Sequence, residues 1–351
     1  MCSYIFSFCV LFAFSLIVFW NCKKHSSSHL TREFYLQNLN NLRGIFALEI
    51  VIGHVVRYEQ TILYPLGKFM ICSVAFFFFV SAFGMAVSYE KKKDYVNIGF
   101  ILSKPVYLLT LSLLIFILSM GVDTVCPNNL SYLISPLWHS YLTKTNWYLW
   151  SLIVFYLLFF FSYKYLYKFH LSFICIITIL LSIIMYLNGS SEAWVASSFA
   201  FPFGLIVGEH FKTVRQFIFS RKGILTLIAL TLFGLSCLLI TTENITSLVF
   251  MRNSMCLASI IILLYICSFL TLGNHAIAHY LNKYSTEIYL SQFIWLEVTG
   301  SYGLHYMVRM PLVLTATFLS AMLLHPIVKS IKKFFVNCSL IHLPKIFRQK
   351  Y

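Results

Sequence analysis

The chain has 351 residues, of which 60% are hydrophobic and only 11% are charged, and its mean hydropathy is +0.82. This small number of charged residues cannot cover the surface of a water-soluble globule. The composition therefore excludes a soluble fold and indicates a protein of the lipid bilayer. The net charge of +15 does not indicate a nucleic-acid partner, because the basic residues stand in short clusters between apolar runs.

Eleven apolar segments are long enough to cross a hydrocarbon core, which takes roughly 17–25 residues in a helix. In chain order they are 4–20, 42–58, 69–89, 100–121, 147–163, 170–187, 195–210, 223–241, 251–271, 285–300 and 311–328. The sequence therefore predicts an all-α fold, a polytopic integral-membrane helical bundle with about 11 transmembrane helices.

The distribution of basic residues predicts the orientation of these segments. If the N-terminus lies outside, 21 of the 26 Lys and Arg residues fall on the cytoplasmic side, as the positive-inside rule requires. Segment 4–20 lacks a basic leading region and a small-residue cleavage site, so we interpret it as an uncleaved anchor. We expect three parts: an N-terminal anchor with a cytoplasmic lead-in at 1–38, a membrane domain at 39–330 and a basic cytoplasmic tail at 331–351.

Neither the cysteines nor the histidines show the spacing of a metal site. The ten Cys residues are scattered without a C-x-x-C pair, so we expect them to behave as small apolar residues. His275 and His279 are one helical turn apart, but no third ligand stands near them. We therefore expect no metal.

Two ionisable residues share one apolar segment. Arg43 and His54 are eleven positions apart, which is close to three full helical turns, so both side chains lie on one stripe and about 16 Å apart along the axis. Glu49 is rotated away from that stripe. Ionisable groups at membrane depth are costly and usually face a bundle interior or an aqueous cavity, which favours a functional site. Two structural roles stay open: Arg43 as a topology residue at the headgroups, and His54 as a hydrogen-bonded packing residue.

The stretch "LRGIFALEIVIGHV" resembles the opening helix of the acyltransferase-3 family, whose hallmark is an Arg, ten residues and a His. Further resemblances follow in the expected order: "FFFFVSAFGM" (76–85), "NWYLWSLIVFYLLF" (146–159), "FAFPFGLIVGE" (199–209) and "YSTEIYLSQFIW" (284–295). Two residues depart from the pattern, since Ala82 replaces a usual Gly and Gln292 stands where a His is typical. The family core has ten spans, which makes segment 4–20 an addition.

The resemblance implies an integral-membrane O-acyltransferase that uses acetyl-CoA as cosubstrate. It implies that Arg43 holds the CoA phosphates and that His54 acts as general base or as an acyl carrier. Ser81, Trp147, Tyr289 and Glu297 are further candidates for contacts with substrate, with helix packing or interfacial anchoring as the alternative for each.

The resemblance also implies an acceptor and a location. The acceptor would be a surface polysaccharide or its lipid-linked repeat unit, such as the O-antigen of a lipopolysaccharide, a capsule or an exopolysaccharide. The protein would be a multi-pass protein of the cytoplasmic (inner) membrane. A polysaccharide flippase and a glycan polymerase are the alternatives. Against them, the chain shows no repeated halves and no large polar outer loop.

Overall fold

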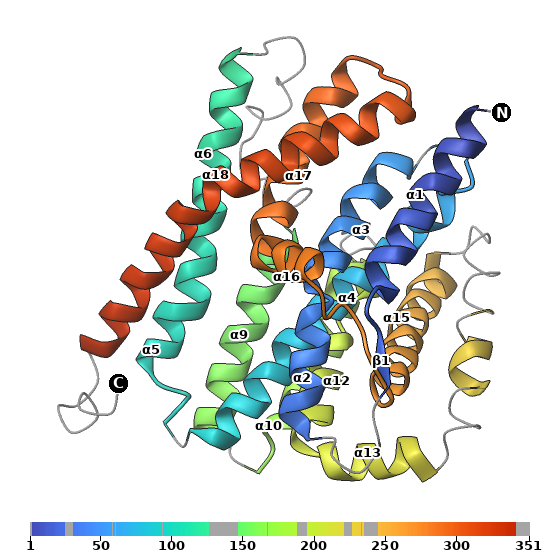
Figure 1. Cartoon of the computed structure of the whole chain (residues 1–351). Helices are drawn as coiled ribbons and strands as arrows, with labels where there is room; N and C mark the ends of the chain where they lie inside the picture. The colour runs from blue at the N-terminus through green and yellow to red at the C-terminus, as the bar shows by residue number, and fades with distance from the viewer. Residues whose placement is uncertain are drawn as a thin grey trace. The chain divides into compact units, whose positions relative to one another are not determined.

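The computed structural model describes residues 2–24, 31–57, 59, 61–92, 94–125, 147–166, 168–187, 195–220, 227–232, 234 and 245–341. These residues are almost entirely helical (Figure 1), and they form two compact units. Unit 1 combines Met1–Glu90 with Cys175–Tyr289, and unit 2 combines Lys91–Ile174 with Leu290–Tyr351. The helices α10 (His170–Leu187) and α17 (Ser285–Ser301) each run from one unit into the other.

Unit 1 contains most of the first third of the chain and the segments that pack on it. Its elements are α1 (Cys2–Phe19), β1 (Lys23–Lys24), α2 (Arg32–Asn41), α3 (Arg43–Val56), α4 (Tyr64–Lys91), α12 (Ala200–Glu209), α13 (Phe211–Ser220), α15 (Ile245–Cys267), β2 (Leu270–Thr271) and α16 (Ala276–Lys283). The two short strands pair antiparallel, with Lys23 opposite Thr271.

The helix α4 forms the core of unit 1. Four of its aromatic side chains, Phe76, Phe78, Phe79 and Phe83, are almost completely buried. The rings of Phe79 and Phe83 stack with their centroids 5.9 Å apart. The sequence of α4 is hydrophobic on all sides of the helix and does not show an amphipathic stripe, as expected for a helix that is buried on several sides.

Glycines let α12 approach α4 closely. A Cβ atom on Gly204 would lie 2.5 Å from the carbonyl oxygen of Phe79, and one on Gly208 would lie 2.5 Å from Ala86 Cβ. Close approach at small residues is typical of helix pairs in membranes. Gly204 also leaves room for Ala82 on α4, since a Cβ atom on Gly204 would lie 2.9 Å from Ala82 Cβ.

Unit 2 is built around α9 (Trp147–Tyr165). Its other elements are α5 (Ile98–Ile101), the π-helical turn η2 (Leu102–Val106), α6 (Tyr107–Val125) and α18 (Tyr306–Ile341). Phe100 on α5 packs against the rings of Tyr156, Phe159 and Phe160 on α9. The π-turn contains Pro105, which has no backbone N–H to donate and thus fits an irregular turn.

Polar side chains join α17 to α18 within unit 2. The indole of Trp295 donates to Ser320 Oγ over 2.8 Å, and the hydroxyl of Ser291 donates to the carbonyl oxygen of Thr317 over 3.3 Å. Arg309 Nη2 donates to the carbonyl oxygen of Leu296 over 2.9 Å. Hydrogen bonds between helices are a common way to hold membrane bundles together.

The structure confirms the predicted class of fold. Six of the described helical segments are long and apolar enough to span a membrane: Arg32–Val56, Tyr64–Lys91, Ile98–Ile117, Trp147–Tyr165, His170–Leu187 and Tyr306–Asn337. Shorter apolar helices cover Tyr4–Phe19, Ala200–Glu209 and Met251–Cys267. The predicted span at 223–241 lies mostly outside the described residues, so the count of eleven stays a prediction.

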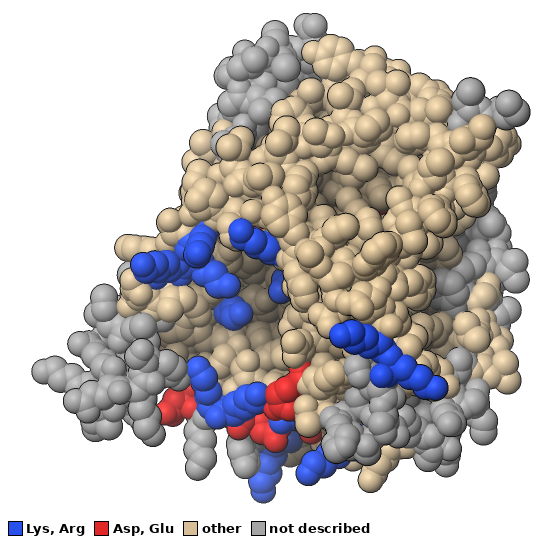
Figure 2. Space-filling view, in the orientation of Figure 1, with Lys and Arg blue, Asp and Glu red and all other residues tan. Residues whose placement is uncertain are grey.

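The described surface is that of a membrane protein. Many large apolar side chains are exposed, among them Phe8, Ile179 and Leu323. Figure 2 shows wide areas that carry neither basic nor acidic side chains. So many exposed apolar side chains on a surface with few charges fit contact with lipid. The chain is therefore a multi-pass membrane protein.

Candidate functional site

Arg43 and His54 lie on one uninterrupted helix, as their spacing predicts. Arg43 is the first residue of α3 and His54 lies in its last turn. Both side chains are half-buried. At 1.5 Å per residue they are about 16 Å apart along the axis, and at 100° per residue they lie on the same side of it. The helix thus presents a guanidinium near one end and an imidazole near the other.

The pairing of α3 with α4 fixes the orientation of this helix. Near the Arg43 end, the rings of Phe46 and Phe76 lie 4.3 Å apart. Near the His54 end, a Cβ atom on Gly53 would lie 3.0 Å from Met70 Cβ. The two helices therefore run antiparallel and in contact along most of α3. His54 directly follows Gly53, one of the residues at which α4 packs closely against α3.

A buried carboxyl group lies between these two contacts. Glu49 is only 4% exposed, and neither of its oxygens has a hydrogen bond of regular geometry in the structure. The buried hydroxyl of Ser73 on α4 is near enough to act on this carboxyl group electrostatically. Glu49 therefore faces α4, which agrees with its predicted rotation away from the Arg43 and His54 stripe.

The helix α16 crosses α3 at the residue after Arg43. A Cβ atom on Gly44 would lie 2.3 Å from both the backbone N of Asn282 and the backbone C of Leu281. Only glycine permits such an approach, because a Cβ atom this close to backbone would force one of the helices to move. The position of Arg43 is thereby tied to α16.

The side chain of Arg43 has no hydrogen bond or ion pair with any residue that the structure describes. A half-buried guanidinium with five N–H donors and no acceptor among the described residues can bind an anionic ligand. At the other end, the guanidinium of Arg57 is near enough to the His54 imidazole to act on it electrostatically.

Ser81 and Tyr289, two further candidates, belong to the same unit as α3. Tyr289 is buried, and its ring lies 6.4 Å from that of Phe77 on α4. Ser81 lies one turn further along α4 and is half-buried. Ser81 is thus part of α4 and Tyr289 packs against it, and α4 is the helix that also contacts α3.

Trp147 and Glu297 belong to unit 2. Trp147 is the first residue of α9 and is largely buried, with its ring centroid 6.4 Å from that of Tyr148. Glu297 lies on α17 with an exposed side chain. Gln292, at the position where the resemblance predicts a His, is completely buried on α17.

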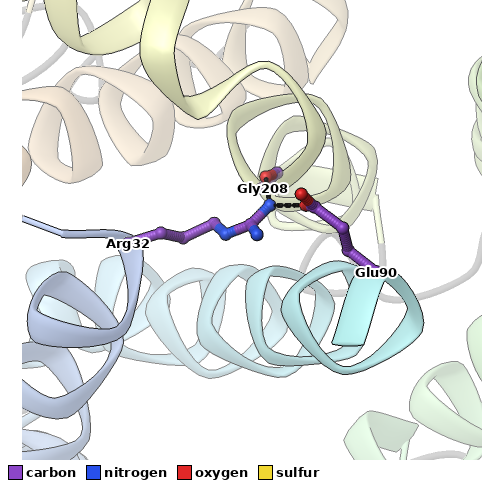
Figure 3. Close-up of polar contacts among 3 residues, drawn as sticks. All are labelled: Arg32, Glu90 and Gly208. Carbon is purple, nitrogen blue, oxygen red and sulfur yellow. Dashed lines mark hydrogen bonds and ion pairs between the residues drawn. The ribbon is translucent and has the colours of Figure 1, made fainter. Parts of the chain in front are cut away.

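Arg32 is a polar residue whose role the sequence did not indicate (Figure 3). It forms an ion pair with Glu90 at the end of α4, and its Nη1 also donates to the carbonyl oxygen of Gly208 on α12 over 3.0 Å. Arg32 thereby joins the start of α2 to the ends of two other helices. Its signal in the sequence was weak, because it stands among other basic residues that the positive-inside rule explains.

The arrangement offers chemistry suited to group transfer. An imidazole can accept a proton or an acyl group, and a guanidinium can bind phosphate with two parallel hydrogen bonds. Among the described residues, no group of three or more His, Cys, Asp or Glu side chains is placed to hold a metal ion.

Comparison with known proteins identifies an acyltransferase family. A family model described as an acyltransferase domain (acyltransferase-3) matches residues 36–327, which is most of the chain. No curated protein and no solved structure matches the sequence. The matched region begins within α2 and contains α3 with both Arg43 and His54.

Proposed function

Because the chain belongs to the acyltransferase-3 family and is thus a membrane acyltransferase, we propose that it transfers an acyl group, most often acetyl, from cytoplasmic acyl-CoA to a sugar hydroxyl. The acceptor would be an extracytoplasmic polysaccharide such as an O-antigen, a capsule or an exopolysaccharide, or its lipid-linked repeat unit. The observation that carries this proposal is Arg43, which has no hydrogen bond or ion pair to the described residues and lies on the same helical stripe as His54.

Arg43 would bind the donor. Coenzyme A carries phosphate groups, and the forked geometry of a guanidinium suits phosphate better than the single ammonium of Lys does. Arg43 has no acceptor among the described residues, so binding CoA would break none of the hydrogen bonds or ion pairs that they form. Its place beside Gly44, where α16 passes at contact distance, would keep the backbone of this position fixed.

His54 would carry the chemical step. As general base, its imidazole takes the proton of the acceptor hydroxyl while the oxygen attacks the thioester carbonyl carbon. The C–O bond then forms, the C–S bond breaks, and the CoA thiolate leaves and is protonated. In the alternative, the imidazole nitrogen takes the acyl group first and passes it to the hydroxyl. General base catalysis typically contributes about 10²–10⁴ in rate.

The proposed topology brings the two substrates to opposite ends of α3. With the C-terminus in the cytoplasm and the N-terminus outside, Arg43 lies at the cytoplasmic end and His54 toward the outer half of a cytoplasmic (inner) membrane. Reporter fusions after residues 92, 166 and 341 should then report the cytoplasm, while one after residue 59 should report the outside. The reverse pattern would contradict the proposed path from donor to acceptor.

The function can be tested on surface glycan from cells with and without the gene. We expect a loss of about 42 Da per modified repeat on deletion, the mass of one acetyl group added in place of hydrogen. His54→Ala should abolish the modification and Arg43→Lys should strongly reduce it, with normal amounts of protein in the membrane. His279→Ala is the matched control, because this imidazole lies on α16 and bonds only to the nearby Asn274 Oδ1 in the described structure.

The same experiment separates the proposal from its alternatives. A flippase or polymerase would change the amount or chain length of the glycan, while an acyltransferase changes the mass of its repeat. Full acetylation by His54→Ala would remove the catalytic role of this residue. An unchanged repeat mass on deletion would rule out this glycan as acceptor.

A further inference from the structure

Two cysteine side chains meet where α4 and α15 pack together in unit 1. Cys256 on α15 is almost completely buried, and its thiol lies 3.7 Å from the carbonyl oxygen of Ile71 on α4. The thiol of the next residue, Cys72, is close enough to interact with that of Cys256. Both are reduced in the structure, and Cys72 is the more accessible of the two. Their contact is tertiary, which explains why no spacing in the sequence indicated it.

The two thiols lie at the same depth, close to an aqueous boundary. Lys68 stands one turn before Cys72 on α4, and Arg252 stands one turn before Cys256 on α15. The Lys68 ammonium lies 5.1 Å from the centroid of the half-exposed Tyr64 ring, an arrangement typical of the headgroup region. Both cysteines are therefore only about 6 Å further along their helices than residues that mark the membrane surface.

The predicted topology puts this boundary on the extracytoplasmic side. Lys68 and Arg252 are among the five basic residues that the orientation leaves outside, and disulfides form and persist there, whereas cytoplasmic thiols are kept reduced. The contact of the Cys256 sulfur with the backbone of residue 71 brings the helices close together beside Cys72. A disulfide requires Cα atoms about 4.4–6.8 Å apart, a distance that such contacting helices can supply.

We propose that Cys72 and Cys256 form a reversible disulfide that joins α4 to α15 at the extracytoplasmic end of unit 1. The thiolate of Cys72, the more accessible residue, attacks an oxidant of the protein or small-molecule disulfide class and forms a mixed disulfide. The thiolate of Cys256 then displaces the second sulfur of the oxidant. Two thiol protons are released and the oxidant leaves as two thiols, so its two sulfurs take up the two electrons.

The disulfide would restrain α4, the helix that packs against α3 at the candidate site. Cys72 directly precedes Ser73, the residue that faces Glu49, and it follows Met70, which contacts Gly53 beside His54. A covalent link from α4 to α15 would therefore restrain the helix that supports α3. The inference depends on the proposed topology and does not depend on the nature of the acyl acceptor.

Mass spectrometry of the full-length protein tests the proposal. Membranes are denatured in N-ethylmaleimide, which blocks free thiols, and the protein is digested without reductant. We expect a linked peptide pair that contains Cys72 and Cys256, that dithiothreitol separates and that glutathione disulfide increases before blocking. Cys72→Ser and Cys72→Ala should each abolish the pair and leave Cys256 alkylated, while Cys175→Ser should retain it.

The residues Cys22 and Cys267 provide an internal control. They are also near neighbours in unit 1, but the proposed topology puts them on the cytoplasmic side. They should be recovered in alkylated form from the same digest. Full alkylation of Cys72 and Cys256 even after treatment with glutathione disulfide would overturn the proposal, as would a linked peptide that pairs Cys256 with another cysteine.

Discussion

The contact between α3 and α16 predicts that Gly44→Ala destabilises unit 1. The new Cβ atom would lie 2.3 Å from two backbone atoms of α16, well inside ordinary van der Waals contact. Both atoms belong to the main chain, so no side-chain rotation relieves the overlap and α16 must shift by about 1 Å. Overpacking costs about 1–3 kcal/mol, and the better helix propensity of Ala returns about 0.5–1 kcal/mol. The expected net loss is about 1–2 kcal/mol.

Thermal unfolding of the purified protein in detergent measures this loss. We expect the Tm of Gly44→Ala to fall by about 2–8 °C, taking the usual scaling for units of this size. Acyl transfer should fall as well, because Arg43 moves with its neighbour. The control is Gly84→Ala, where the nearest atom to the new Cβ would be Leu36 Cδ1 at an ordinary 3.7 Å, so its Tm should stay equal or rise. An unchanged Tm for Gly44→Ala together with a lowered one for Gly84→Ala would refute the reasoning.

Three other substitutions test separate parts of unit 1 by the same measurement. Asn38→Ala should lower stability by about 2–3 kcal/mol, because the buried amide of Asn38 bonds to the backbone of residues 267, 270 and 272, which would lose their partner. Glu49→Leu should leave the Tm unchanged or raise it, because the substitution removes a buried carboxyl group without a regular hydrogen bond. A lower Tm would show that Glu49 has a stabilising partner. Arg32→Gln should lower stability by about 1 kcal/mol. Glu90→Gln should cost less than about 0.5 kcal/mol, because the side chain of Glu90 is 61% exposed. Equal losses for the two variants would contradict this order.

The long apolar segments of the fold could be predicted from the sequence. The predicted segments at 4–20, 42–58, 147–163 and 170–187 match helices to within two residues at each end. Each is predominantly apolar over a length that can span the membrane, so composition identifies it even where, as in 42–58, a few ionisable residues interrupt it. The helix α4 begins five residues earlier than predicted and includes Pro65 and Gly67. Pro is well accepted in the first turn of a helix, and Gly67 provides room for the backbone of Arg57.

The helix α2 could not be predicted in this way. Its sequence contains Asn38, Asn40 and Asn41, which are poor helix formers, and from the sequence alone the segment is interpreted as a polar lead-in. Its stability comes from tertiary contacts: the amide of Asn38 bonds to the turn that follows α15, far away in the sequence. A local signal was present in Thr31, whose hydroxyl caps the helix by accepting from Phe34 N.

The candidate site likewise combines features that the local sequence predicts with features that depend on tertiary contacts. The common side of Arg43 and His54 follows from the geometry of one helix, so their spacing alone predicted it. The surroundings of these residues depend on other helices. Nothing local indicated that Glu49 would face Ser73, or that Gly44 would meet α16, because both contacts join segments whose relative position only the fold decides.

The attachment of α1 to α16 has a consequence for the biogenesis of the protein. The Nδ1 atom of His275 accepts from Ala278 N, so Nε2 carries the proton and donates to the carbonyl oxygen of Ile17 over 2.7 Å. These two partners are 258 residues apart in the chain. At about 5–20 residues per second, the ribosome needs on the order of 10–50 s between them. During that interval α1 must wait without its hydrogen bond to His275, and this contact of unit 1 forms only when α16, one of the last helices to be made, arrives.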